Sequence, residues 1–101
     1  MVRRLKLSEK LHEVLGSDNV YFQPPTNKKM SFPCIVYEFA RFNTTFADNL
    51  PYKLDRIYQV TYIDSNPDSD IPEKLAELPM CVFERSYISE NRYHYSFRIT
   101  I

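Results

Sequence analysis

The sequence has a single glycine, Gly16, and no tryptophan among its 101 residues. One glycine cannot build the glycine-rich loop that cradles phosphates, so nucleotide-binding motifs of that kind are excluded. No apolar run is long enough to span a bilayer. The basic start of the chain is followed by Ser8, Glu9 and Lys10, which leave no apolar segment for a signal peptide. We therefore expect a cytosolic protein.

An excess of charge of either sign is also absent, because thirteen Lys and Arg residues balance thirteen Asp and Glu residues. A neutral protein has no general attraction for nucleic acid or for an anionic membrane, so any such contact must come from a local patch. Apolar residues make up 44% and charged residues 26%, which is typical of a globular protein. At this length we expect one domain, residues 1–101.

Cysteine is scarce as well, with Cys34 and Cys81 the only two. In the cytosol we expect both thiols to be reduced. The two could in principle form a disulfide, but each lies in an apolar stretch, which favours small buried side chains.

Aromatic residues are abundant, with eight Tyr and seven Phe. Rings of this kind favour strands, and they suit a sheet whose side chains straddle the surface or meet a partner. In the last strand Tyr93, Tyr95 and Phe97 alternate with His94 and Ser96, so the two sets face opposite sides of the sheet. The predicted strands cover residues 20–23, 34–42, 56–64, 80–89 and 93–101, with a tight turn at Glu90 and Asn91.

A first helix is predicted from the spacing of Leu7, Leu11, Val14 and Leu15, which form one apolar stripe. Gly16 follows the stripe at the position where a left-handed residue ends a helix.

A second, shorter helix is predicted over residues 71–78. Asp70 is its expected cap, Glu73 completes a capping-box spacing, and Pro72 lies in the first turn. Pro79 ends the helix because it removes a backbone donor and restrains the residue before it.

These elements predict an α+β fold, an antiparallel sheet of four to five strands with two helices packed on one face. The opposite face carries Tyr, His, Arg and Thr, so we expect it to be partly exposed to solvent. Such a face suits a lumen, a groove or a partner surface. The last strand could leave an open edge that pairs with a neighbour.

Catalysis finds little support in the sequence, and we expect no enzyme, no cofactor and no metal. His12 and His94 lie far apart, and neither has a metal-ligand partner at a recognised spacing. Cys34 lacks the local signature of a thiol nucleophile.

The acidic residues Asp64, Asp68 and Asp70 resemble an ion-binding loop only loosely. They lack the glycine and the bidentate Glu of a calcium loop, so turn formation and capping explain them better.

The basic residues Arg85, Arg92 and Arg98 can line up on the last two strands together with His94. They could face a polyanion or line a lumen, although surface solubility is the simpler interpretation.

Residues 43–55 are predicted to be a loop by their Thr, Asp, Asn and Pro content, yet they carry bulky aromatic side chains. One interpretation is that the loop folds back and tucks Phe42, Phe46 and Tyr52 under the end of the sheet. The other is that the loop is an arm that buries these rings on another subunit, since Tyr and Phe are common interface anchors.

Several segments together resemble a known family. They are FPCIVYE, FADN with a following Tyr, YQVTYID, IPEKL and the final YISENRYHYSFRITI. This pattern of spacings and residue types is similar to the small tail-completion proteins of long-tailed bacteriophages, the tail terminators and head–tail joining proteins, which also occur in defective prophages. The resemblance covers nearly the whole chain.

The resemblance implies a structural α+β protein that forms a ring, usually a hexamer, at the head-proximal end of the tail. The ring would cap the tail tube protein, dock to the head–tail connector protein and let DNA pass without specific binding. Its location would be the virion, with the host cytoplasm during assembly. In this interpretation Phe46, Ala47, Asp48, Asn49 and Tyr52 contact a neighbour. The alternative is a small protein- or peptide-binding module of a prophage or bacterial host that forms no ring.

Overall fold

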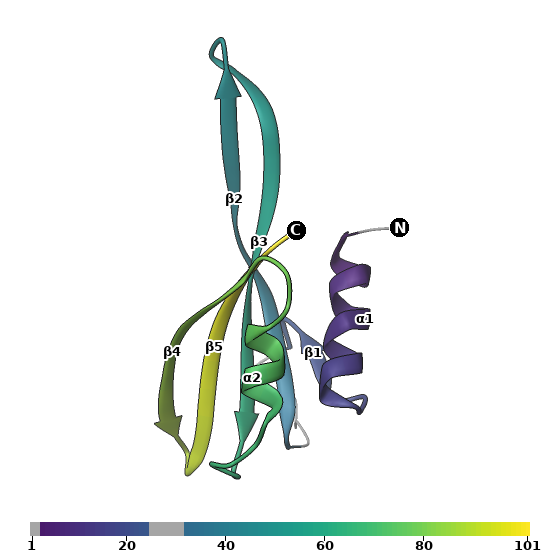
Figure 1. Cartoon of the computed structure of the whole chain (residues 1–101), viewed down its shortest axis with the longest axis vertical. Helices are drawn as coiled ribbons and strands as arrows, with labels where there is room; N and C mark the ends of the chain where they lie inside the picture. Colours follow the sequence, from purple (N-terminus) through teal and green to yellow (C-terminus); the bar gives the residue numbers. More distant parts are fainter. Residues whose placement is uncertain (1–2, 25–31) are drawn as a thin grey trace.

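The computed structural model describes residues 3–24 and 32–101, except for the side chains of Arg3 and of residues 51–53. The order of helices and strands agrees with the sequence-based prediction (Figure 1). The helices are α1 (Arg3–Leu15) and α2 (Ile71–Ala76), and the strands are β1 (Val20–Phe22), β2 (Cys34–Ala47), β3 (Leu50–Asp64), β4 (Cys81–Ser89) and β5 (Arg92–Thr100).

The strands form one five-stranded sheet in the order β1-β2-β3-β5-β4. All neighbours are antiparallel except β1 and β2, which run parallel. The α+β class is therefore confirmed, but the expectation of a wholly antiparallel sheet is wrong for β1. A parallel neighbour needs a long connection, and residues 23–33 between β1 and β2 provide one.

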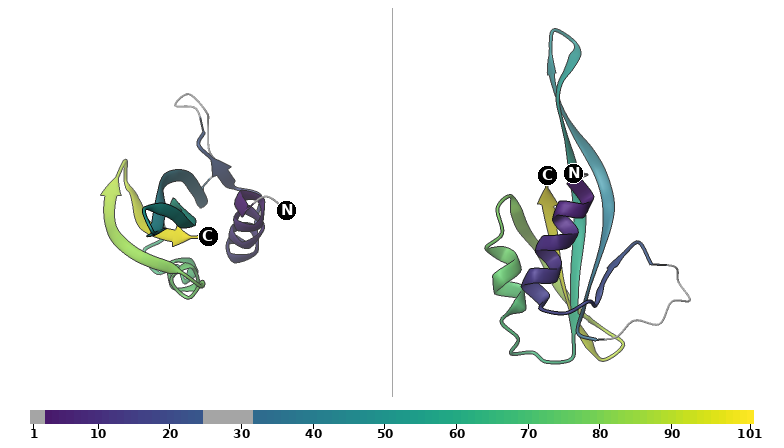
Figure 2. Two further views of the ribbon diagram at one scale, coloured as in Figure 1. Left: turned by 90° about the horizontal axis from the view of Figure 1, so that it is seen from above. Right: turned by 90° about the vertical axis from the view of Figure 1, so that its right-hand side faces the viewer.

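Both helices cover the same face of the sheet, as Figure 2 shows from the side. Their apolar stripes meet the sheet residues that the alternation predicts to point inward, so burial follows the sequence pattern. The buried cluster consists of Leu7, Leu11, Ile35, Tyr37, Tyr58, Val60, Tyr62, Leu75, Phe97 and Ile99.

The end of α1 follows the prediction. Gly16 has a φ of +76°, the left-handed conformation that costs glycine least, and its N–H donates to the carbonyl of His12 at 2.8 Å.

The start of α2 differs from the prediction. The Oγ of Ser69 accepts the hydrogen bond from the N–H of Ile71 at 3.3 Å, and among the described residues no cap bond comes from the side chain of Asp70. The carboxylate of Asp70 instead lies 3.6 Å from the ammonium of Lys74. The helix also ends at Ala76, two residues before the predicted end.

The turn between β3 and α2 is held by a buried polar group. The hydroxyl of Tyr62 donates to the carboxylate of Asp64 at 2.6 Å and lies 3.0 Å from the hydroxyl of Ser69. The second carboxylate oxygen of Asp64 accepts from the N–H of Asn66 at 3.1 Å. The N–H of Asp68 donates to the side chain of Asn66 at 3.0 Å. The carboxylate of Asp64 thus shapes the turn, as predicted, whereas Asp68 contributes its backbone N–H and the predicted capping by Asp70 is wrong.

The largest departure concerns residues 43–55, which are not a loop. β2 and β3 continue through this stretch as a two-stranded ribbon that extends from the end of the body (Figure 1). A two-residue turn closes it, with φ of +52° at Asp48 and +65° at Asn49. Positive φ at both central positions is the type I′ geometry that matches the twist of a hairpin. We call residues 43–55 the hairpin arm.

Candidate functional site

The hairpin arm begins where the end of the chain pairs with β3. The N–H of Arg56 donates to the carbonyl of Ile101, and the N–H of Ile101 donates to the carbonyl of Arg56, both at 2.9 Å. Beyond this pair β2 and β3 contact only each other among the described strands. The molecule measures 50 × 25 × 23 Å, and the arm accounts for its long axis (Figure 1).

A chain of aromatic rings ties the base of the arm to the core. The rings of Phe22 and Tyr37 have centroids 4.9 Å apart, and those of Tyr37 and Tyr58 are 6.3 Å apart. Phe39 follows at 5.8 Å from Tyr58 and 4.9 Å from Phe42. Edge contacts of this kind add to the stability that burial alone provides. The arm is therefore rooted in the core and projects from it.

One face of the arm is apolar. Phe42, Thr44 and Phe46 alternate along β2, and Leu54 lies opposite Thr44 on β3, so all four share a face. Phe42 is 48% exposed and Phe46 64% exposed. Leu54 on the same face and Leu50 on the other are also exposed.

These exposures decide between the two interpretations of the predicted loop. The interpretation in which the segment folds back and covers its own rings is wrong for Phe42 and Phe46, because the ribbon leads both away from the body. Phe42 keeps a contact with Phe39 at the base, and the guanidinium of Arg56 lies 5.5 Å from its ring centroid.

The remaining predicted interface residues lie at the tip of the arm. Ala47 ends β2, Asp48 and Asn49 form the turn, and all three are exposed. The backbone of Tyr52 lies in β3 at a register shift, and its side chain is outside the described residues.

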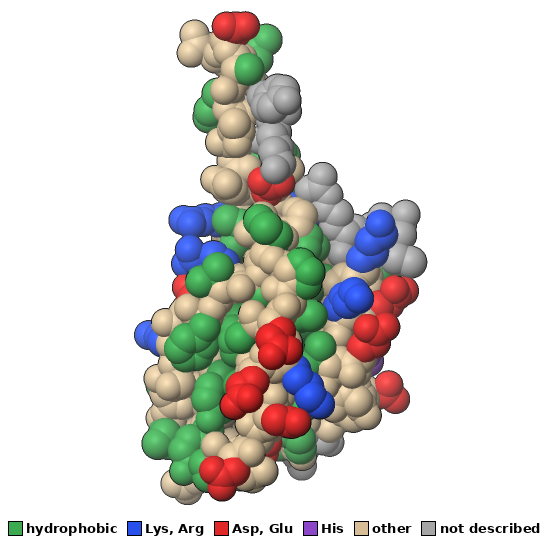
Figure 3. All heavy atoms as spheres, in the orientation of Figure 1, with side chains coloured by type: hydrophobic (Ala, Val, Ile, Leu, Met, Phe, Trp, Pro, Cys, Tyr) green, Lys and Arg blue, Asp and Glu red, His purple; other side chains and the backbone are tan. Residues whose placement is uncertain are grey.

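A second set of exposed apolar side chains lies on β4, which the sequence analysis did not single out. Every residue of this strand after Cys81 is exposed, including Val82 at 64% and Ile88 at 69%. Phe83, Tyr87 and, just before the strand, Met80 are exposed too. Figure 3 shows the hydrophobic side chains gathered over the region of β4 and β5.

The position of β4 at the end of the sheet explains this exposure. In the described part of the chain it has one neighbour, β5, whereas β5 lies between β3 and β4. The expectation that the last strand leaves an open edge is therefore wrong. α2 has only six residues and covers the sheet only in part. The sequence signal for these exposed side chains of β4 was the presence of adjacent apolar residues, which do not alternate with polar ones, as in Val82-Phe83 and Tyr87-Ile88.

The predicted basic residues do share one face. Arg92, His94 and Arg98 alternate along β5, and Arg85 of β4 lies opposite Ser96. This is the face opposite the helices, because Phe97 and Ile99 point toward the core.

The charges on this face are engaged by neighbours. The guanidinium of Arg98 bonds the carboxylate of Glu84 at 2.7 Å. The ring of Tyr87 stacks on that of His94 at 4.8 Å, and Arg85 lies 5.1 Å from the centroid of Tyr87. These are cation–π and stacking contacts, which align the side chains without neutralising Arg85. Whether the face lines a lumen stays a prediction.

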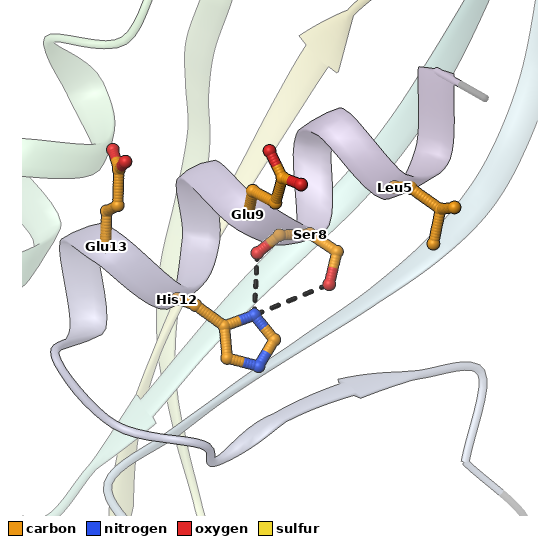
Figure 4. A pocket seen from close by; sticks show the side chains of 5 residues that line it. All are labelled: Leu5, Ser8, Glu9, His12 and Glu13. Carbon is orange, nitrogen blue, oxygen red and sulfur yellow. Dashed lines mark hydrogen bonds between the residues drawn. The ribbon is translucent and has the colours of Figure 1, made fainter. Parts of the chain in front are cut away.

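A shallow pocket along α1 contains one histidine and two glutamates (Figure 4). The Nδ1 atom of His12 lies 2.7 Å from the carbonyl oxygen of Ser8 and 3.4 Å from its hydroxyl. Glu9 and Glu13 line the same pocket, but Figure 4 shows their carboxylates pointing away from the imidazole. The pocket therefore has no carboxylate–imidazole pair among its described residues.

The two thiols are poor nucleophiles. Cys34 is completely buried, and burial raises its pKa to about 11, while the positive charge of Arg92 opposes that rise. Burial likewise raises the pKa of Cys81 to about 11. Both stay protonated at neutral pH, and only the thiolate is reactive. Both are free; they lie on β2 and β4 with two strands between them, so they are at least roughly 14 Å apart, which is too far for a disulfide.

A comparison with protein-family models and with curated proteins gives no match. Within the described residues there is no group of three His, Cys, Asp or Glu side chains that could hold a metal ion. No described helix has the length and apolar character needed to cross a membrane. The most prominent surface features of the described residues are the exposed apolar side chains of the hairpin arm and of β4.

Proposed function

We propose that this protein is a structural component of phage tail assembly, a ring-forming subunit that caps the tail tube and docks to the head connector. The proposal joins the sequence resemblance to tail-completion proteins with one structural observation. A projecting hairpin arm carries large apolar side chains that its own chain leaves exposed.

The distribution of exposed apolar side chains carries the argument. Nearly all large hydrophobic side chains that remain exposed lie either on the arm and its base or between Met80 and Ile88; Leu5 and Phe32 are the others among the described residues. Burying one such side chain completely contributes about 1.5–3 kcal/mol. A monomer forgoes this contribution at every one of these positions, whereas a partner surface recovers it.

A ring requires two different patches on each subunit, one that meets the other on the next copy. The arm and β4 are two such patches, because they lie in different parts of the molecule and differ in shape. In this proposal the aromatic residues of the arm are retained for burial between subunits, and net neutrality suits a conduit that does not bind its DNA.

The test is to add the purified protein to polymerising tail tubes and to image whether it caps one end. Sedimentation over a range of concentrations measures the solution mass in parallel. Capping at one end, with growth stopped, supports the proposal. Tubes that grow at the same rate with and without the protein, together with a monomer at every concentration, overturn it. Leu5→Ser, an exposed apolar site on α1 away from both patches, is the matched control for variants of the arm.

The second candidate is a protein- or peptide-binding module that forms no ring. It is favoured by β4, because an exposed edge strand can accept a peptide as an additional strand. A strict monomer that binds an extended peptide along β4, with no effect on tail tubes, would support this candidate over the first.

A further inference from the structure

We infer that the edge of β4 receives the hairpin arm of a second copy of the chain, so that the sheet continues from one subunit into the next. This inference rests on the proposed function and names the receiving surface for the arm. It commits to parallel strand addition between residues 43–47 of one copy and residues 85–89 of another.

The receiving strand is regular only in its second half. β4 has a register shift between Phe83 and Arg85, whereas residues 85–89 pair one to one with β5. A bulge disrupts pairing on an edge strand, so residues 85–89 are the part fit to accept a further strand. Its exposed edge lacks proline and lysine, the residues that commonly block such pairing.

The arm also has one edge suited to pairing. The β3 side of the arm contains Pro51, which has no N–H to donate, and Lys53, so it is protected. The β2 side, residues 43–47, reads Asn-Thr-Thr-Phe-Ala and carries no charge and no proline. The two segments, residues 43–47 and residues 85–89, each have five residues and therefore match in length.

The side chains of the two strands fit in one arrangement. Phe46 lies on the apolar face of the arm, and Ile88, opposite Tyr93, lies on the helix side of the sheet, where it remains 69% exposed. Placing Phe46 beside Ile88 puts Thr45 on the opposite face, beside Tyr87, because side chains alternate along both strands. Tyr87 is already stacked on His94, so the polar Thr45 suits that position.

The arm cannot reach β4 of its own chain, because it extends away from the body at the end of the sheet (Figure 1). The longer of its two strands, residues 50–55, spans about 20 Å. That reach is comparable to the 25 × 23 Å cross-section of the molecule, so the arm can extend across a neighbouring subunit. The contact is therefore between copies and head to tail.

The experiment is cysteine cross-linking in a Cys81→Ala background, which leaves only the buried Cys34. Thr45→Cys is made in one preparation and Tyr87→Cys in another, and the two are oxidised separately and as a mixture, in solution and on tail tubes. Opposed residues of paired strands are close enough for a disulfide. We expect a cross-linked dimer in the mixture and its loss when either variant is oxidised alone.

Each other outcome is informative. A dimer from Tyr87→Cys alone indicates that two β4 edges pair with each other, which overturns the inference. No cross-link in any mixture, although the protein caps tubes, overturns the inference and leaves the proposed function standing. A protein that neither associates nor caps tubes overturns both.

A second variant tests the same surface without cysteine. Ile88→Lys places a charge on the proposed contact of β4, at a site already exposed to solvent, so the fold should be retained. We expect association to weaken roughly tenfold or more. Leu5→Lys, an equally drastic change on α1, should leave association unchanged; equal effects of the two variants would contradict the inference.

Discussion

The rings of Phe39 and Phe42 lie edge to face, with centroids 4.9 Å apart, at the point where the hairpin arm leaves the body. Phe39 also contacts Tyr58 in the core, so it joins the buried and the exposed aromatic residues. The arm is held at its base by side-chain packing and, beyond that, by the pairing of β2 with β3.

Phe39→Ala should therefore loosen the base of the arm. The ring is half-buried, so we expect the free energy of unfolding to fall by about 2 kcal/mol, below the range for a fully buried Phe. Amide exchange at residues 43–47 should become faster, because the arm loses its anchor. Urea unfolding and hydrogen exchange measure the two effects. Unchanged exchange in the arm would contradict the anchoring role.

Phe46→Ser should leave the stability of the fold nearly unchanged and weaken association instead. The ring is 64% exposed, so the free energy of unfolding should change by less than about 0.5 kcal/mol. Association, measured by sedimentation, should weaken roughly tenfold or more because an interface anchor is lost. A Phe46→Ser protein that unfolds would indicate that the ring packs on its own chain after all.

Asn49 at the tip is expected to tolerate glycine and not valine. Its φ of +65° strains a β-branched residue, so Asn49→Val should destabilise the turn by about 1–3 kcal/mol. Asn49→Gly should preserve it, because glycine adopts this conformation without strain. Asn43→Val, in the strand of the same arm, is the control and should be neutral. Hydrogen exchange in the arm distinguishes the three, and equal protection in all of them would exclude a strained tip.

Removing the hydroxyl of Tyr62 tests the polar group that holds the turn before α2. Tyr62→Phe leaves the carboxylate of Asp64, only 8% exposed, without its 2.6 Å donor. We expect a loss of about 1–3 kcal/mol in the free energy of unfolding. Tyr87→Phe, which removes an exposed hydroxyl, should cost little. Similar losses in both variants would mean that the buried bond contributes nothing specific.

Alkaline pH should destabilise the fold. The pKa of Cys34 is about 11 in the folded chain and near 9.0 when unfolded, because burial disfavours the thiolate. Above pH 9 the unfolded chain releases this proton while the folded chain keeps it, so stability is complete below pH 9 and declines toward pH 11.

Burial and the carboxylate of Asp64 raise the pKa of Tyr62 as well, in the same direction. Unfolding measured from pH 8 to 11 should show the decline, and Cys34→Ala should make it shallower. An identical slope in that variant would show that Cys34 does not ionise with unfolding in this range.

Local signals were sufficient for most of the secondary structure. The stripe ending at Gly16, the alternation around Phe97 and the turn at Glu90 and Asn91 all depend on neighbours in sequence, and the structure bears them out. The arm differs from the prediction because Asp48-Asn49 also fits the composition of a loop. In fact Asp and Asn are among the few residues that adopt the left-handed conformation, so the pair is also a two-residue hairpin turn.

Outside residues 43–55, the sequence by itself determined which segments are helical or extended and which face of most strands is apolar, and it showed that bulky rings lie near position 46. These depend on spacing along the chain, which folding does not change. Only the tertiary structure decided that β5 is interior, that β4 is the exposed edge and that residues 43–55 form a ribbon. Strand order and edge exposure follow from which distant segments pair, and the apolar pattern of β4 is the same whether or not another strand lies beside it.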